Sequence, residues 1–122
     1  MIQGQREPGS RAAVLDPAGE ATLELFRENG AYSEFLLDRL FRLLPEPPRG
    51  RFLEVGCGIG NLTRILLRRS TLEYLRAIDI DPAYVSRVRS EVQDPRLEVS
   101  AASAEDFCPA EHQGEGGFDA IV

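Results

Sequence analysis

The sequence has little of what metal centres, disulfide scaffolds and membrane segments require. Its two cysteines, Cys57 and Cys108, lie far apart and have no metal-ligand spacing, so we predict no bound metal. Nothing indicates a disulfide framework, and we expect a reducing, cytoplasmic compartment. No apolar run is long enough to cross a membrane, so no membrane partner is predicted. The single histidine, His112, stands in a polar, glycine-rich stretch, where a solvated side chain is expected.

An excess of basic residues is also absent. The chain of 122 residues has 14 Lys and Arg against 20 Asp and Glu, a net charge of −6. This balance disfavours a large nucleic-acid footprint, which normally shows as a basic surface. Arg64, Arg68 and Arg69 could form a local basic patch, but a solvated helix face is the simpler interpretation. We therefore favour a small-molecule substrate over a nucleic acid, and the oligomeric state is not predicted.

The chain divides into three segments. Residues 1–19 are polar and end in a turn-like sequence at residues 16–19, which predicts a flexible N-terminal segment. Residues 20–45 carry apolar residues at helical spacing, with a break at residues 29–30, and form a helical lead-in of two helices. Their apolar faces are expected to pack on a sheet rather than to form a lid. Residues 46–122 form the third segment.

Strands and helices alternate in this third segment, which predicts an α/β fold with a doubly wound, Rossmann-like parallel sheet. We expect Asn61 or Thr63 to cap the first of its helices and Asp81 to cap the second. The predicted strands are residues 51–55, 74–80, 97–101 and 118–122, and the predicted helices are residues 61–69 and 82–92.

The most informative feature is the turn that follows the first strand. Gly56, Gly58 and Gly60 are spaced two apart, which suits a sharp backbone turn that approaches a ligand closely. Glu54 lies near the end of this strand and Asp79 near the end of the next one, at the edge where open α/β sheets bind ligands. A carboxylate such as that of Asp79 can accept hydrogen bonds from both hydroxyls of a ribose.

The glycine motif reads E-x-G-x-G-x-G and resembles the first motif of class I S-adenosylmethionine (AdoMet)-dependent methyltransferases. Residues 77–81 resemble the second motif of that family, residues 102–107 the third, and residues 118–122 the start of the fourth. The resemblance spans residues 51–122 and implies AdoMet as the cofactor. The family fold has seven strands and this sequence supplies about four. We therefore expect residues 46–122 to be a truncated, AdoMet-binding part of a longer protein, inactive alone.

The resemblance also implies which residues contact the cofactor. The matching acid, Glu54, would lie near the methionine ammonium, Asp79 would bind the ribose hydroxyls, and Ile80 would pack on adenine. Ser103 stands where the family often has an acid, so it would make a weaker adenine contact. No catalytic base can be named. The full cofactor set is Glu54, Gly56, Cys57, Gly58, Gly60, Asp79, Ile80, Ser103 and Ala104.

Four functions stay open at this point. The favoured one is an AdoMet-dependent methyltransferase acting on a small molecule or a saccharide. A ribosomal-RNA adenine dimethyltransferase resembles residues 53–66 and 77–82, but its N-terminal glutamine-asparagine-phenylalanine segment is absent. An NAD-dependent oxidoreductase would use Asp79, but its G-x-G-x-x-G spacing is missing. The last alternative is a truncated remnant without catalysis.

Overall fold

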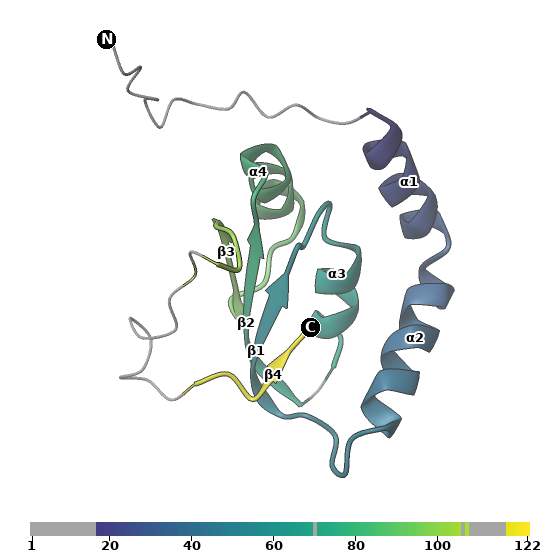
Figure 1. The fold of residues 1–122 in the computed structure, drawn as a ribbon, viewed down its shortest axis with the longest axis vertical. Coiled ribbons are helices and arrows are strands. Elements are labelled where there is room, and N and C mark those ends of the chain that lie inside the picture. Colours follow the sequence, from purple (N-terminus) through teal and green to yellow (C-terminus); the bar gives the residue numbers. More distant parts are fainter. Residues whose placement is uncertain (1–16, 70, 106, 108–116) are drawn as a thin grey trace, which may run out of the picture.

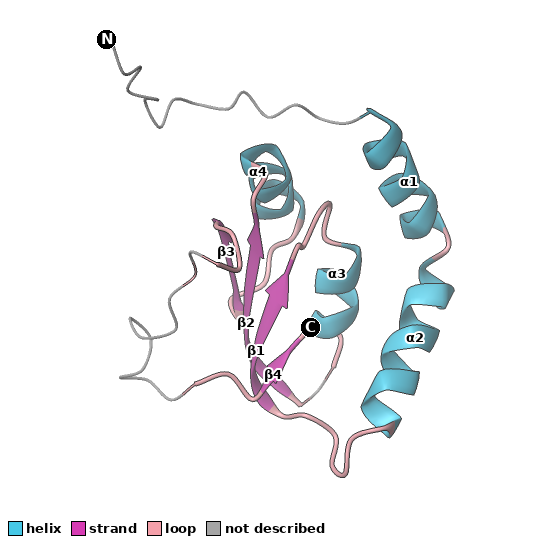
Figure 2. Ribbon diagram, in the orientation of Figure 1, coloured by secondary structure: helices cyan, strands magenta, loops and turns pink. Residues whose placement is uncertain are grey.

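The computed structural model describes residues 17–122, except residues 70, 106 and 108–116. The predictions for residues 1–16, Cys108 and His112 therefore fall outside the described residues. Figures 1 and 2 show a sheet with α3 and α4 beside it, and with α1 and α2 further out on the side of α3. In chain order the elements are α1 (Pro17–Glu28), α2 (Gly30–Arg42), β1 (Gly50–Val55), α3 (Asn61–Leu67), β2 (Leu72–Asp79), α4 (Pro82–Glu91), β3 (Leu97–Ala101) and β4 (Ala120–Ile121).

The sheet has four parallel strands in the order β3-β2-β1-β4, which confirms the predicted Rossmann-like α/β fold. From β1 the chain builds outward through β2 to β3, and then returns to the other side of β1 to form β4. The strand order therefore reverses between β1 and β4. In open α/β sheets such a switch point is where ligands bind, beyond the carboxyl ends of the strands.

One face of the sheet is covered by both crossover helices. Phe52 pairs with Leu75 in the β1–β2 register, so these two buried side chains point to the same face. Leu66 of α3 packs on them, and each such fully buried side chain contributes about 1.5–3 kcal/mol of folding free energy. Val88 of α4 packs further along the same face, against Ala77. Two helices on one face agree with right-handed crossovers.

The lead-in helices lie along one side of the molecule, with α3 between α2 and the sheet (Figure 1). The prediction that they pack on the sheet is confirmed for two residues of α2. Leu37 is buried in the core, and the Phe41 ring meets the Phe52 ring edge-on, with centroids 6.2 Å apart. Other apolar side chains of α2, including Leu40 and Leu43, stay exposed.

The lead-in helices also correct the sequence-based boundaries. The turn predicted at residues 16–19 is wrong for Pro17 onward, because α1 begins at Pro17. Proline suits the first position of a helix, since its missing N–H has no helical partner there. The break at residues 29–30 is confirmed. Gly30, however, begins α2, and the Asn29 side chain donates a hydrogen bond to the Leu25 carbonyl oxygen at 2.8 Å.

Capping also differs from prediction in one of the two crossover helices. The cap of α4 is confirmed, because the Asp81 carboxylate accepts a hydrogen bond from the Ala83 amide at 2.8 Å. The cap predicted for α3 is wrong: Gly60 is its N-cap residue, and the side chains of Asn61 and Thr63 bond elsewhere. Among the described helices, none has the length and apolar character needed to span a membrane.

Candidate functional site

The glycine turn lies at the carboxyl edge of the sheet, between the ends of β1 and β2. The amides of Gly56 and Cys57 both donate to the Ile78 carbonyl oxygen, at 2.8 and 3.0 Å. The turn is therefore fastened to the last residues of β2 immediately after leaving β1. This arrangement brings Glu54 and Asp79, the two predicted ligand acids, to the same corner of the molecule.

The three glycines adopt left-handed backbone conformations but have different surroundings. Their φ angles are 79° at Gly56, 52° at Gly58 and 87° at Gly60. A Cβ at position 58 would lie 3.3 Å from Leu23, and one at position 60 would lie 3.2 Å from Val88. At position 56, no described atom beyond Gly56 and its two chain neighbours lies within 4 Å of such a Cβ. Gly58 and Gly60 thus serve helix packing, while Gly56 faces open space that a ligand could occupy.

Glu54 is a buried carboxylic acid at the end of β1, with 2% of its surface exposed. The Thr63 hydroxyl donates to its Oε2 at 2.6 Å. Burial raises the pKa of Glu54 to about 7, the Thr63 hydrogen bonds lower it, and the negative charge of Asp79 raises it further. The site thus holds a carboxyl group that would gain from a neighbouring positive charge.

Asp79 ends β2 and is also buried. Its Oδ2 accepts a hydrogen bond from the Gly58 amide at 2.8 Å, and its Oδ1 accepts one from the Asp81 amide at 2.9 Å. Each carboxylate oxygen has a second lone pair. Asp79 therefore organises the backbone around it and keeps capacity to accept ligand hydroxyls.

The predicted adenine contacts lie next to Asp79 along the edge of the sheet. Ile80 follows it directly and has 76% of its surface exposed. The backbone of Asp79 pairs with β3, where its carbonyl oxygen accepts a hydrogen bond from the Ala102 amide at 3.0 Å. Ser103 and Ala104 come next, and the Ser103 carbonyl oxygen accepts from the Phe107 amide at 2.9 Å, which closes a turn after β3.

A cleft of about 820 Å³ opens beside the glycine turn, between the lead-in helices and strands β1 and β4. Of the predicted cofactor residues it is lined by Glu54, Gly56, Cys57 and Gly58. Gly60, Asp79, Ile80, Ser103 and Ala104 are not in its lining. The remainder of the lining is mostly apolar and comes from Leu23, Phe26, Ser33, Leu36, Leu37, Leu40, Phe41, Leu43, Leu44, Val55, Asn61, Leu62, Asp119, Ala120, Ile121 and Val122.

The Cys57 thiol in the glycine turn is buried, with 5% of the residue exposed. Burial raises the pKa of Cys57 to about 12, and the negative charges of Glu54 and Asp79 add to this effect. The thiol therefore stays protonated at neutral pH and cannot act as a nucleophile. Its place in the site is that of a small apolar side chain packed against Val85 and Val88.

Sequence reasoning missed several residues that support the turn. Thr63 was expected to cap a helix and instead bonds Glu54. The Asn61 side chain donates to the Leu23 carbonyl oxygen at 2.9 Å, which connects α1 to the turn. The guanidinium of Arg64 donates to the Ile59 carbonyl oxygen at 2.8 Å. These contacts join positions that no local pattern relates, although a polar Thr63 on the buried side of α3 was a signal that a polar partner lies beneath.

The site has the chemical groups that AdoMet binding requires. The desolvated Glu54 carboxyl suits a cationic ammonium, open space above Gly56 admits a ligand, and Asp79 has free acceptor capacity. Exposed Ile80 offers an apolar surface for an adenine ring. The residues present therefore fit the cofactor.

The chain has similarity to one protein family and to solved structures. A search of curated proteins found no match. Among solved structures, the chain is similar to a Listeria monocytogenes protein provisionally described as an S-adenosylmethionine-dependent methyltransferase. That match has 20% identity and a TM-score of 0.48, and covers 64% of this chain and 35% of the other. The chain thus spans about a third of that protein's length. A family model described as "Methyltransferase domain" matches residues 52–122, over half of the sequence, and the chain therefore belongs to the methyltransferase-domain family.

Proposed function

We propose that the protein is an AdoMet-dependent methyltransferase and that this chain supplies the cofactor site. The observation that carries the proposal is the pair of buried acids, Glu54 and Asp79, on adjacent strand ends on either side of a left-handed glycine turn. This is the edge at which Rossmann-like sheets bind nucleotides. The membership of residues 52–122 in the methyltransferase-domain family supports the same function.

The residues of this chain would act mainly by positioning. When bound, AdoMet would supply an activated methyl group: an acceptor nucleophile would bond to the methyl carbon in line as the carbon–sulfur bond breaks and S-adenosylhomocysteine leaves. Glu54 would hold the ammonium of the methionine part, and its desolvation strengthens that interaction. Asp79 would accept the ribose hydroxyls while its bond to the Gly58 amide keeps the turn in place. Fixing the donor in this way lowers the entropic part of the barrier.

A small-molecule acceptor is the substrate class that the surroundings of the turn favour. The cleft beside it has a volume within the usual range for small-molecule sites. Its lining is mostly apolar, including Phe26, Leu40 and Ile121. We infer that an acceptor with an apolar surface suits it better than a saccharide does. The cytoplasmic location expected from the cysteine content is part of this proposal.

The arginines in α3 and just after it give a nucleic-acid acceptor less support than the cleft gives a small molecule. Arg64 pairs with Glu91 at 2.8 Å, Arg69 pairs with Asp38 at 2.5 Å, and Arg68 pairs with Glu34. The cluster thus joins helices to one another. Its charge is already balanced by acids, so it offers little to a phosphate backbone.

Calorimetric titration of S-adenosylhomocysteine into the 122-residue chain tests the proposal, with NADH titrated in parallel. We expect binding of S-adenosylhomocysteine alone, and at least about tenfold weaker binding by Asp79→Ala, which loses the ribose acceptor. Binding of NADH instead would favour an oxidoreductase. A folded chain that binds neither nucleotide would overturn the proposed function and favour a remnant without catalysis.

A further inference from the structure

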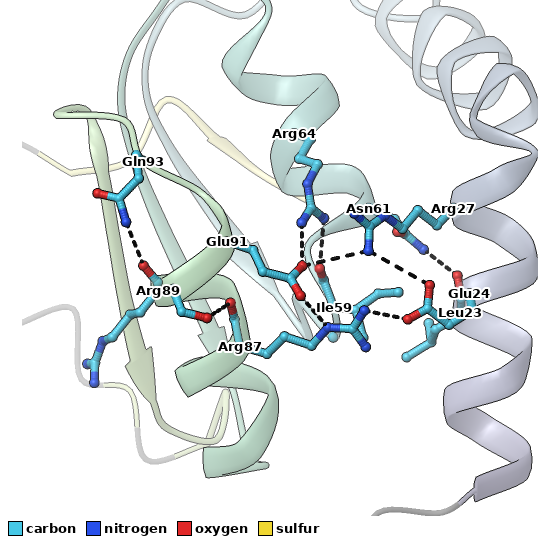
Figure 3. A network of polar contacts seen from close by, with 12 residues as sticks. Leu23, Glu24, Arg27, Ile59, Asn61, Arg64, Arg87, Arg89, Glu91 and Gln93 are labelled. Carbon is cyan, nitrogen blue, oxygen red and sulfur yellow. Dashed lines mark hydrogen bonds and ion pairs between the residues drawn. The ribbon is translucent and has the colours of Figure 1, made fainter.

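A network of charged side chains from α1, α3 and α4 contacts the glycine turn (Figure 3). Arg64 of α3 stands at its centre. Its Nη1 donates to the Ile59 carbonyl oxygen at 2.8 Å, and its Nη2 donates to Glu91 of α4 at 2.8 Å. Ile59 lies between Gly58 and Gly60, and its carbonyl belongs to the Ile59–Gly60 peptide. This contact therefore fixes the orientation of that peptide within the glycine turn.

Glu91 is in turn held from two sides. Arg87, one helical turn earlier on α4, donates to its Oε1 at 3.0 Å, and Arg27 of α1 lies 3.7 Å from its Oε2. Arg87 also reaches α1, where it pairs with Glu20 at 3.3 Å and with Glu24. The network therefore connects α1, α3 and α4 to a single backbone carbonyl of the turn.

A second set of contacts, made by uncharged groups, joins α1 to the same turn. The Asn61 side chain donates to the Leu23 carbonyl oxygen at 2.9 Å (Figure 3). The Leu23 side chain packs against Gly58, where an added Cβ would lie only 3.3 Å away. Polar and apolar contacts from α1 thus converge on residues 58–61.

We propose that Arg64 is a positioning residue for the cofactor site, and that α1 belongs to this site through the network around Glu91. Partly exposed ion pairs contribute little to overall stability, and the side chains of Arg64 and Glu91 are 27% and 33% exposed. The main consequence of the Arg64 contacts is therefore local: they hold the Ile59–Gly60 peptide in the left-handed turn. This inference rests on the proposed function, because the ligand that benefits is the cofactor.

The test compares Arg64→Met with Arg68→Met in the full 122-residue chain. Both variants remove an arginine ion pair at α3, but Arg68 pairs with Glu34 of α2 and, among the described residues, its side chain has no hydrogen bond to the turn. S-adenosylhomocysteine affinity is measured by calorimetry, and stability by denaturant unfolding. We expect about tenfold weaker binding for Arg64→Met, partial recovery in Arg64→Lys, and a change within about twofold for Arg68→Met. Equal affinities of Arg64→Met and Arg68→Met would overturn the proposal.

Hydrogen exchange of the turn amides gives a readout that needs no ligand. The Gly60 amide donates to the Cys57 carbonyl oxygen at 2.9 Å, and its exchange reports on the integrity of the turn. Arg64→Met is expected to accelerate this exchange several-fold more than Arg68→Met does. Glu91→Gln, a milder change, should act in the same direction if Arg64→Met does not fold.

The two readouts separate failure of this inference from failure of the proposed function. Suppose that the wild type binds no S-adenosylhomocysteine, but that Arg64→Met still accelerates exchange of the Gly60 amide. This result would refute the proposed cofactor and leave Arg64 with a structural role in the turn. Binding by the wild type, with affinity and exchange unchanged in both Arg64→Met and Glu91→Gln, would refute the role of Arg64 alone.

Discussion

The Asp79 carboxylate accepts a hydrogen bond from the Gly58 amide at 2.8 Å, across 21 residues of sequence. Its second oxygen accepts from the Asp81 amide, which leads into α4. One buried acid therefore organises both the glycine turn of β1 and the exit from β2. The same acid is the predicted ribose acceptor, so on the proposed function the shape of the turn and the binding of the ligand would both depend on this side chain.

Asp79→Asn is expected to weaken both the turn and the ligand site. An amide side chain presents an NH₂ group toward one of the two backbone N–H donors, where the carboxylate presented an acceptor. We expect about 1–3 kcal/mol lower free energy of unfolding and at least about tenfold weaker S-adenosylhomocysteine binding. Denaturant unfolding and calorimetry measure the two effects.

Asp81→Ala is the matched control, because the Asp81 carboxylate caps α4 through the Ala83 amide and, within the described part of the chain, has no hydrogen bond to the glycine turn. Losing this cap should cost about 1 kcal/mol of folding free energy and leave the affinity within about twofold. A loss of affinity in Asp81→Ala equal to that in Asp79→Asn would assign the effect to general destabilisation.

Local sequence patterns were sufficient to predict the order of elements in this chain. The apolar run before Gly56 indicated β1, and the Asp81-Pro82 pair located the start of α4. Both features are local, because they involve only residues that are close together in the sequence. Pro17 was misread as part of a turn. Proline is common both in turns and at the first position of a helix, so its identity alone does not distinguish them.

The candidate site was predictable in its acids and glycines but not in their supports. Glu54 and Asp79 lie at the carboxyl ends of apolar strands, and parallel strands present these ends at one edge. The bonds from Thr63 to Glu54 and from Arg64 to Ile59 depend on the rotation of α3 on the sheet. That rotation is set by tertiary packing and cannot be read from the local sequence. The position of Thr63 near the start of α3 therefore indicated a cap and not a bond to Glu54.

Gly56→Ala and Gly60→Ala are expected to separate ligand binding from packing. Both glycines have positive φ, so alanine costs about 1–2 kcal/mol of backbone strain at either position. At position 60 the methyl group would also press on Val88 and Arg64, at 3.2 and 3.1 Å, so this variant should be the less stable one. At position 56 the methyl enters open space and should mainly reduce S-adenosylhomocysteine affinity.

Thermal unfolding and calorimetry on both glycine variants check this separation. The ratio of affinity loss to stability loss should be larger for Gly56→Ala than for Gly60→Ala. If Gly56→Ala binds with wild-type affinity, the space above Gly56 is not where the ligand lies.

The Cys57 thiol is expected to resist alkylation in the folded protein. Burial raises its pKa to about 12, so the reactive thiolate is scarce at pH 8. In a Cys108→Ser variant Cys57 is the sole thiol, and iodoacetamide labelling followed by mass spectrometry reports on it alone. Labelling should be at least about a hundredfold slower than in denaturant. Rapid labelling of the native chain would show that the turn opens readily.

Glu54 is expected to make the folded chain less stable as the pH rises from 4.5 to 7. Burial raises its pKa from 4.5 to about 7, so between these values the folded chain keeps a proton that the unfolded chain has lost. Proton retention by the folded state makes the free energy of unfolding fall with pH, by roughly 3 kcal/mol in total. The contribution is fully present below pH 4.5 and lost above pH 7.

Glu54→Gln removes this titration and can still accept a hydrogen bond from Thr63. Urea unfolding at pH 5 and pH 8 should therefore show a smaller pH dependence for the variant, which becomes more stable than the wild type at pH 8. The wild type should also release a proton when it binds S-adenosylhomocysteine at pH 6, because the ligand ammonium favours the ionised carboxylate. Calorimetry in buffers of different ionisation enthalpy detects that proton. Parallel stability curves for the two proteins, with no proton release, would show that Glu54 is ionised throughout this range and is not desolvated as its burial indicates.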